Sequence, residues 1–574
     1  MSSVCTRSGN TSFRIHLTGA YRDEVLVDIH DGTGLAIERT MDERMNVLMR
    51  DAKRKEVVKM KRRSIFQYLL VLVLVFGALN QVQAADTPKS GGVLRVADTA
   101  SPPTLDFMCS TSTATRVVGT HIFEGLMAYD KNYQVVPMLA ENYEVGADGK
   151  TFVFRLRKGV LFHNGDEMKA EDVKACVDRF IAVSPRKRDL ADLESVNVID
   201  DYTIEFKLKK PIGPFLGILA NPVALLAIMP KEAVEGKPLN KADIIGTGPY
   251  QLVEWIPDRH VKIKRFKDYK PLDTPGSGYA GKKGAYLDEI NFVPVTEPGA
   301  RVAGLEAGDY DFADFLPGTN VPDLKAEPRL AVKPLMPFTW PVMYFNFKRI
   351  FKDIKMRQAV QAGLDLESIM IAGSEGEGSG RLDPGLYFKE QVWHSDIGKQ
   401  YYNQNDKEKA RRLMKDAGYK GEEIIVVTNT SYEYMYKSAI VVEQELKEMG
   451  FNVKLVVLDW PGALALRKDL SKWDMFFSSH SIRFDPFINN FYFLPETTFF
   501  AYDNPEMAKW IRKGMDSVRF EERKEAYDQI QRIFYEDAVM IKLYDLGIWQ
   551  GWQKHVKGYE PWYMLQFLNT WVEK

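Results

Sequence analysis

The sequence predicts an α/β protein that is built from at least two lobes. The chain has 574 residues, too many for one compact hydrophobic core. Short strands with alternating apolar residues are mixed with segments of helical periodicity. Residues 423–459 combine a strand, a helix and a second strand, which is the pattern of a parallel βαβ crossover.

The elements of the first half follow from periodicity. Residues 151–156 and 203–208 alternate apolar and polar side chains, so each is expected to be a half-buried strand. Residues 170–180, between them, have apolar side chains at helical spacing. Acidic residues stand in the first turn of this expected helix, where the helix dipole favours them.

The second half contains the clearest unit. We expect strands at 423–428 and 451–459, separated by a helix over 434–449 that ends at Gly450, a residue type common at left-handed helix caps. A further helix is expected over 406–417. Ligands of parallel sheets bind beyond the carboxyl ends of the strands, so the end of the second strand is a candidate ligand position.

An export signal is predicted at residues 60–84. A basic start, KMKRR from Lys59, precedes an apolar run from Tyr68 to Leu79, and Val82-Gln83-Ala84 suits signal peptidase. A membrane anchor is the alternative, but the run is well short of the roughly 20 residues that span a bilayer. The protein is therefore expected to be exported, soluble and periplasmic.

Residues 1–59 do not fit an exported product. A signal peptide has its basic region at the very start, and Met60-Lys-Arg-Arg matches such a start. We interpret residues 1–59 as an upstream over-extension of the reading frame, with a cytoplasmic pre-segment as the alternative.

Charge and cysteine content exclude some functions. The formal net charge is −1, and residues 1–84 hold 13 Lys and Arg against 9 Asp and Glu, an excess of four, so the remainder carries −5. A mature chain with this net negative charge does not favour nucleic-acid binding. Cys109 and Cys176 have no metal-type spacing; two buried free thiols are favoured over a disulfide.

No catalytic or cofactor motif is present in the sequence. There is no phosphate loop, no G-x-S-x-G elbow and no H-E-x-x-H helix. His163 and His480 are isolated, and a lone histidine is more often a structural hydrogen-bonding group than a metal ligand. We therefore expect no enzyme, no cofactor and no metal. An exported hydrolase, or a chaperone or receptor, is the alternative function class.

An ordered set of motifs resembles the family 5 extracellular solute-binding proteins, which include oligopeptide, dipeptide and nickel-complex binders. The longest is DGKTFVFRLRKG, which is followed by FHNGD and AEDV. The set consists of residues 91–96, 103–106, 121–126, 137–141, 148–159, 162–166, 170–173, 246–250, 305–311, 353–359 and 556–558.

The resemblance implies a two-lobe clamp that closes on a small-molecule ligand. A monomer is expected to deliver the ligand to the membrane subunits of an ABC permease, whose ATPase supplies the energy. The implied divisions are lobe I at 85–126, 197–337 and 552–574, its small subdomain at 127–196, and lobe II at 338–551.

Several ligand-binding positions are carried over from the family. Trp460 matches an aromatic residue that lies against the ligand, although it could be a core residue. Arg467 matches a cleft arginine, with a role on the helix surface as the alternative. Trp340 could belong to the cleft or to the core. The loop containing Met108 and Thr111 matches a ligand-facing loop.

The segment at 476–486 departs from the peptide binders of the family. These keep an Asp about four residues before Pro486 that anchors the peptide amino terminus, whereas here the position falls at Ile482 or Arg483. His480 replaces an aromatic residue, and Ser481 and Asp485 complete the candidate set. Arg483 predicts an anionic or peptide-like ligand with no required free amine; an Arg483–Asp485 pair facing solvent is the alternative.

The first testable prediction concerns processing. The exported protein should begin at Ala85, because the basic, apolar and small-residue regions occur in that order before it. Amino-terminal sequencing of secreted material checks this. A product that retains residues 1–59, or that remains embedded in the membrane, would contradict it.

Overall fold

The computed structural model describes residues 4–8, 12–16, 87–234, 239–374 and 378–573. The chain forms two units, 1–87 and 88–574. In the first unit, β1 (Val4–Ser8) pairs with β2 (Ser12–His16) as an antiparallel hairpin. The predicted signal peptide lies outside the described residues.

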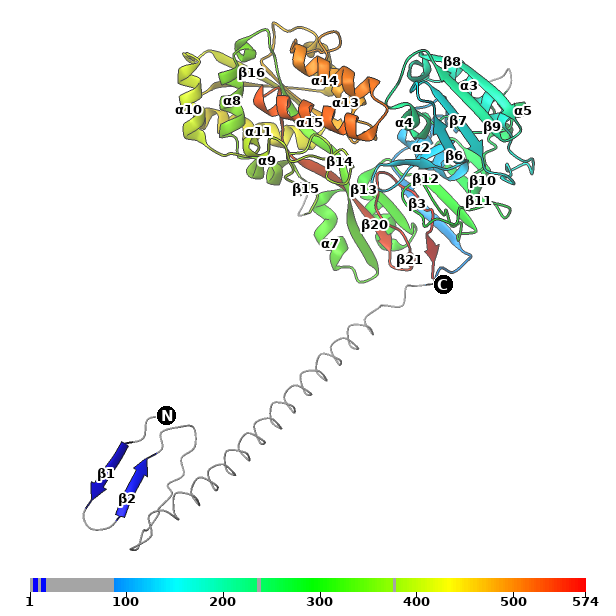
Figure 1. The fold of residues 1–574 in the computed structure, drawn as a ribbon, viewed down its shortest axis with the longest axis horizontal. Helices are drawn as coiled ribbons and strands as arrows, with labels where there is room; N and C mark the ends of the chain where they lie inside the picture. Colours follow the sequence, from blue (N-terminus) through cyan, green and yellow to red (C-terminus); the bar gives the residue numbers. More distant parts are fainter. Residues whose placement is uncertain (1–3, 9–11, 17–86, 235–238, 375–377, 574) are drawn as a thin grey trace, which may run out of the picture. The chain divides into compact units, whose positions relative to one another are not determined.

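One continuous sheet runs through both lobes of the second unit (Figure 1). Its strand order is β10-β11-β12-β3-β13-β20-β14-β18-β16-β17. The strands of lobe I are β3 (Val93–Asp98), β10 (Tyr250–Ile256), β11 (His260–Arg265), β12 (Glu289–Pro294) and β13 (Phe312–Leu316). Those of lobe II are β16 (Glu423–Asn429), β17 (Asn452–Leu458) and β18 (Met475–Ser481).

Two strands cross from one lobe to the other. The 16-residue strand β14 (Leu330–Phe345) pairs along its first part with β20 (Asp545–Gln553), and along its last part with β18. Between these two parts the register shifts, from Leu335 to Thr339. The lobes are therefore joined by backbone that belongs to the sheets of both.

A separate four-stranded antiparallel sheet forms the outer part of lobe I. Its order is β6 (Ala140–Val145), β7 (Thr151–Leu156), β9 (Thr203–Leu208) and β8 (Leu193–Asp200). The apolar residues of β7 and β9 are buried in alternation, so the predicted strands at 151–156 and 203–208 are confirmed. Helix α3 (Ala170–Val183) buries Val173, Val177 and Phe180 and confirms the predicted helix.

The βαβ prediction in lobe II is also confirmed. Strands β16 and β17 are parallel, and α11 (Glu433–Met449) connects them. Gly450 ends this helix at φ 104°, a conformation that glycine adopts without strain. Asp406 caps α10 (Lys407–Asp416) through its carboxylate.

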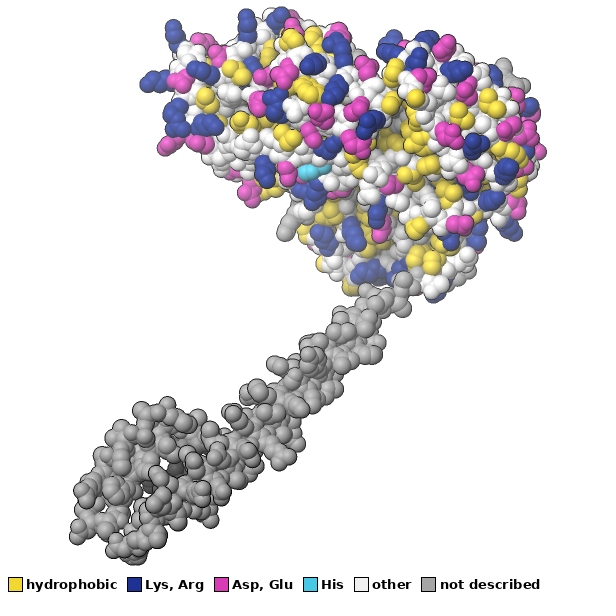
Figure 2. Space-filling model, viewed as in Figure 1, with side chains coloured by type: hydrophobic (Ala, Val, Ile, Leu, Met, Phe, Trp, Pro, Cys, Tyr) yellow, Lys and Arg dark blue, Asp and Glu magenta, His cyan; other side chains and the backbone are white. Residues whose placement is uncertain are grey.

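The remaining helices are divided between the two lobes (Figure 1). Those of lobe I are α2 (Thr113–Ile122), α4 (Phe215–Ala220), α5 (Lys231–Val234), α6 (Pro298–Ala307) and α7 (Val321–Ala326). Those of lobe II are α8 (Ile354–Gly363), α9 (Leu366–Gly373), α12 (Trp460–Arg467), α13 (Phe487–Asn490), α14 (Pro505–Asp516) and α15 (Phe520–Glu536). Side chains of both charges are interspersed over the visible face (Figure 2).

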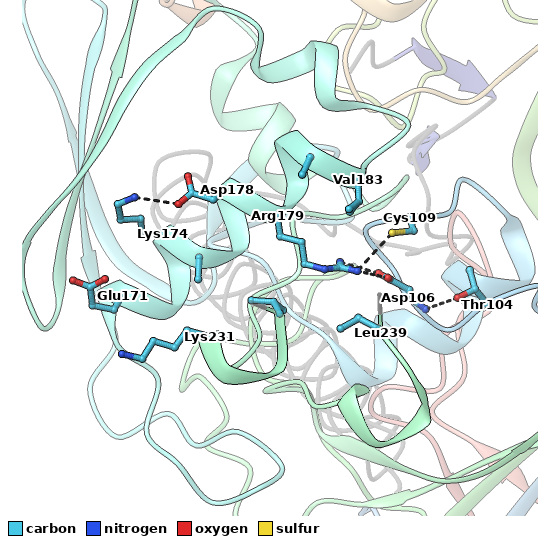
Figure 3. A pocket seen from close by; sticks show the side chains of 13 residues that line it. Thr104, Asp106, Cys109, Glu171, Lys174, Asp178, Arg179, Val183, Lys231 and Leu239 are labelled. Carbon is cyan, nitrogen blue, oxygen red and sulfur yellow. Dashed lines mark hydrogen bonds and ion pairs between the residues drawn. The ribbon is translucent and has the colours of Figure 1, made fainter. Parts of the chain in front are cut away.

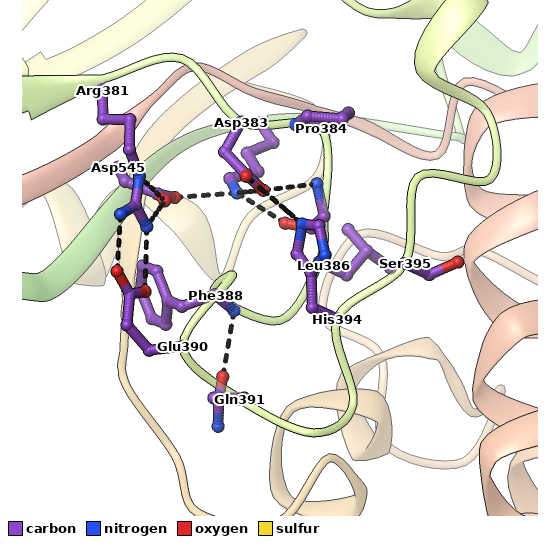
Figure 4. Close-up of polar contacts among 12 residues, drawn as sticks. Arg381, Asp383, Pro384, Leu386, Phe388, Glu390, Gln391, His394, Ser395 and Asp545 are labelled. Carbon is purple, nitrogen blue, oxygen red and sulfur yellow. Dashed lines mark hydrogen bonds and ion pairs between the residues drawn. The ribbon is translucent and has the colours of Figure 1, made fainter. Parts of the chain in front are cut away.

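A buried ionic network holds the loop after β15 (Gly380–Arg381) against the start of β20 (Figure 4). The Nζ atom of Lys542 lies 2.8 Å from Oδ1 of Asp545, and both side chains are fully buried. Arg381 contacts the same carboxylate at 2.7 Å and pairs with Glu390 at 2.6 Å. Burial raises the pKa of Asp545 above its ordinary value, although the charges of Lys542 and Arg381 act in the opposite direction.

This network generates a prediction about stability. Lys542→Met should lower the free energy of unfolding by about 3 kcal/mol, because it removes one of the two cations that neutralise a buried carboxylate. Urea denaturation followed by circular dichroism measures the change. Lys513→Met removes a cation from a solvent-exposed pair with Glu525 and should change stability by less than about 1 kcal/mol. Equal effects of the two substitutions would contradict the prediction.

Candidate functional site

An aromatic surface forms where β14 pairs with β18. The register places Trp340 opposite His480, and their rings stack with centroids 4.4 Å apart. Nε2 of His480 lies 2.5 Å from the hydroxyl of Tyr344, and Tyr492 contacts the histidine edge-on at 5.6 Å. Trp340 is 2% exposed, and its indole N–H has no partner among the described residues. A buried donor without a partner is uncommon in protein interiors.

Helix α12 begins at Trp460 and ends at Arg467. The carboxylate of Asp459 caps the helix by accepting a hydrogen bond from the backbone N–H of Gly462 at 2.9 Å. The half-buried ring of Trp460 packs against Tyr432 with centroids 5.5 Å apart.

The guanidinium of Arg467 lies over an aromatic ring. It is 4.2 Å from the ring centroid of Phe499 and pairs with no carboxylate of the described residues. Burial lowers the pKa of Arg467, and the nearby hydroxyls of Tyr344 and Tyr492 act in the opposite direction. Arg467 is therefore a cation that is held by aromatic contacts rather than by an ion pair.

The segment after β18 reaches lobe I. Phe484 is 3% exposed, and its ring stacks on Tyr129 with centroids 4.4 Å apart. It also contacts Tyr563 at 4.4 Å and Tyr133 at 5.4 Å. These tyrosines belong to lobe I, so Phe484 is an apolar contact between the lobes and places its neighbour Arg483 at the same boundary.

Asp485 does not pair with Arg483. Its two carboxylate oxygens accept hydrogen bonds from Nη2 of Arg523 at 2.7 and 2.8 Å, and both residues are buried. The alternative interpretation of a solvent-exposed Arg483–Asp485 pair is therefore wrong. Because Arg523 already neutralises it, Asp485 is also a poor anchor for a ligand amine.

Arg483 is half-buried and forms no ion pair with any of the described residues. Its backbone carbonyl accepts a hydrogen bond from Nε2 of Gln391 at 2.6 Å, which fixes the backbone of the segment. Burial lowers the pKa of Arg483. The hydroxyls of Tyr563 and Tyr492 act in the opposite direction, and the positive charges of Arg116 and Arg186 lower the pKa by smaller amounts. Such a guanidinium is a binding group for an anion.

Sequence reasoning missed Arg116, which approaches the same boundary from helix α2. Its Nη1 donates to the hydroxyl of Tyr563 at 2.5 Å, and its Nη2 donates to the carbonyl of Thr111 at 3.2 Å. Arg116 is 7% exposed, and its Nε has no partner among the described residues. One feature of the sequence could have pointed to Arg116. It is the one arginine on an otherwise uncharged helix, which directly follows the loop that contains Met108 and Thr111.

The other predicted positions differ in accessibility. Met108 has no exposed surface and packs in the hydrophobic core. Thr111 is exposed, and its carbonyl holds Arg116. Ser481 is exposed at the end of β18, opposite Thr339. The structure brings Trp340, His480 and the 483–485 segment together, and adds Arg116.

A cavity of about 920 Å³ lies elsewhere in lobe I, between α3, α5 and the loop at 104–109 (Figure 3). Arg179 lines it and pairs with Asp106 through two contacts. Cys109 also lines it, and burial raises the pKa of its thiol to about 11. Arg179 thus has a carboxylate partner, and Lys174 pairs with Asp178, in contrast to the arginines at the lobe boundary.

The two cysteines form no disulfide in the described part of the chain, and His163 is held by backbone hydrogen bonds. Cys109 and Cys176 are free; Cys176 is buried, whereas Cys109 is only half-buried. His163 accepts from the backbone N–H of Gly246 through Nδ1 at 3.2 Å, and burial lowers its pKa to about 4. Among the described residues, no group of three His, Cys, Asp or Glu side chains is placed to hold a metal.

Comparison with known proteins identifies the family. The family model for bacterial extracellular solute-binding proteins, family 5, matches residues 134–499. The chain belongs to this family. Similar curated proteins include the oligopeptide-binding protein AppA of Bacillus subtilis, 25% identical over 552 residues, which are 87% of this chain and 97% of AppA. The glutathione-binding protein GsiB of Salmonella choleraesuis is 27% identical over 370 residues, which are 62% of this chain and 67% of GsiB.

Solved structures show the same fold. AppA of Bacillus subtilis in complex with a nonapeptide has a TM-score of 0.64 at 24% identity, and covers 85% of this chain and 100% of its own. AgaA in complex with agropinic acid, from A.tumefacien R10, has a TM-score of 0.62 at 24% identity, with coverage of 84% and 99%. The predicted two-lobe clamp of the family is confirmed.

The family assignment also determines the general role. The protein is a substrate-binding component of an ABC importer, and the predicted transport function is confirmed. Across the described ranges, no helix has the length and apolar character needed to cross a membrane.

Proposed function

We propose that the protein is exported to the periplasm, where it binds an anionic, peptide-like solute between its lobes and delivers it unchanged to permease subunits. Lobe II (338–551) closes as a unit on lobe I (85–126, 197–337 and 552–574) and its small subdomain (127–196). The protein acts as a monomer and catalyses no reaction.

The observation that carries this proposal is the state of Arg483. Its guanidinium is half-buried at the lobe boundary and has no carboxylate partner among the described residues. A buried charge without a partner is costly, so the group that neutralises it is supplied by the ligand. Arg467 of lobe II, which lies over the ring of Phe499, likewise has no carboxylate partner among the described residues.

The surrounding side chains support a peptide-like rather than a purely inorganic ligand. Trp340, His480, Tyr492 and Trp460 offer aromatic faces and an indole donor beside the cations. Sites for organic ligands combine apolar walls with a few fixed polar groups in this way. Because Asp485 already forms an ion pair with Arg523, binding does not require a free amine on the ligand.

The similar proteins support the same ligand class. AppA binds oligopeptides, GsiB binds glutathione, and AgaA was solved with agropinic acid. An amide-linked or acid-bearing organic solute is therefore the first class to screen. Glutathione and tripeptides should be compared with their amino-acetylated and carboxyl-amidated forms by calorimetry.

The screen leads to a prediction for Arg483→Ala. This variant should bind the solute identified more weakly by about 2–5 kcal/mol, the range for removing one member of a buried charge pair. Titration calorimetry measures the change. Arg519→Ala removes an exposed arginine of the same lobe, whose side chain is 72% exposed, and should leave affinity unchanged.

Two results would count against the proposal. One is equal affinity of Arg483→Ala and wild type for the solute. The other is a solute that is uncharged, or one that binds only through a free amine.

A further inference from the structure

Arg116 and Arg483 approach the lobe boundary from opposite sides. Arg116 lies on helix α2 of lobe I and donates to the hydroxyl of Tyr563 at 2.5 Å. The ring of Tyr563 contacts Phe484, which follows Arg483 directly in lobe II, with centroids 4.4 Å apart. One tyrosine therefore connects the two arginine-bearing segments when the lobes are in contact.

The hydrogen bonds of Arg116 differ from those of Arg301, Arg179 and Arg523, which are also buried. Every nitrogen of Arg301 donates to a backbone carbonyl, at 2.7 to 3.1 Å. Arg179 and Arg523 each pair with a buried carboxylate. Arg116 has a hydroxyl, a sulfur and only one carbonyl as partners, and its Nε, like that of Arg179, is buried without a partner among the described residues. Its positive charge therefore has no carboxylate counter-charge among the described residues.

Two such cations at one boundary oppose closure of the lobes. Like charges repel more strongly where water is excluded, and Arg116 lies within electrostatic range of Arg483. The apolar contact of Phe484 acts against this repulsion, but it does not supply a counter-charge. An anion seated between the two guanidiniums would convert the repulsion into two attractions.

We infer that Arg116 and Arg483 bind the same anionic group of the solute from opposite lobes, so that the charge of the ligand holds the clamp closed. This rests on the proposed function and deepens it. The group is a carboxylate or a phosphate, because both accept paired hydrogen bonds from the planar fork of a guanidinium. Arg116 is then a specificity-determining residue: a ligand without the anion binds lobe II but does not close the clamp.

The experiment uses the mature protein and simple anions. Thermal unfolding is recorded in sodium acetate and in sodium phosphate. Sodium chloride at equal ionic strength is the control for each salt. The proteins compared are wild type, Arg116→Gln, Arg483→Gln and the double variant. Wild type should be stabilised by one of the two anions, and small-angle scattering should show a smaller radius of gyration in it. The anion that acts distinguishes carboxylate from phosphate recognition.

The variants decide whether the two arginines share one anion. Each single substitution should weaken the apparent anion affinity at least about tenfold, and the double variant should lose little more, because removing either arginine breaks the same bridge. Arg188→Gln removes an exposed arginine of lobe I and should behave as wild type. Should Arg116→Gln not fold, Arg116→Lys replaces it, since an ammonium lacks the planar fork.

Several outcomes would overturn the inference. One is an anion affinity that is unchanged in Arg116→Gln, or in Arg116→Lys where that variant is used. Another is a loss of anion affinity in the double variant that equals the sum of the two single losses. The third is that neither anion has a specific effect on wild type. If Arg483→Gln weakens binding and Arg116→Gln does not, only the shared-anion inference fails and the proposed function stands. If neither substitution matters, both fail.

Discussion

The two strands that cross between the lobes are the constraint on which the rest of the structure depends. Strand β14 pairs with β20 at one end and with β18 at the other, so the sheets of both lobes meet in one backbone ladder. The register shift between Leu335 and Thr339 divides the part that belongs to lobe I from the part that belongs to lobe II. We expect movement of the lobes to be confined to this short stretch of backbone, in the manner of a hinge. The same strand carries Trp340, so the expected hinge and the proposed ligand surface are built from neighbouring residues.

The buried and half-buried cations of the structure differ in whether they pair with a carboxylate. Arg381, Lys542 and Arg523 pair with buried carboxylates and hold loops and helices in place. Arg116 and Arg483 lie at the aromatic boundary between the lobes, and Arg467 lies over Phe499 in lobe II; none of the three pairs with a carboxylate of the described residues. Ion pairs and backbone carbonyls compensate the buried guanidiniums of the scaffold, such as those of Arg523 and Arg301. Arg116 has only one carbonyl partner and no carboxylate, and we therefore propose a partner from outside there. This contrast, more than the size of any cavity, supports the proposal that an anionic ligand binds between the lobes.

The elements that were predicted correctly depend on local pattern. Strands β7 and β9 follow from strict alternation, and the crossover from β16 to β17 follows from a helix of ordinary length ended by Gly450. Arg483 could be singled out because it stands near a position where peptide binders keep an acid. Arg116 could not, because its role depends on Tyr563, 447 residues away along the chain. The partner of Asp485 is likewise Arg523, 38 residues away, which no spacing rule reveals.

The solute that the protein carries tests the central claim most directly. The protein is purified without denaturation from a host that exports it; native mass spectrometry measures the mass of the complex, and the released solute is then identified. The account predicts one solute per chain, bearing at least one carboxylate or phosphate and chemically intact after prolonged incubation with the protein. A cationic or uncharged solute, or one that the protein converts, would contradict it.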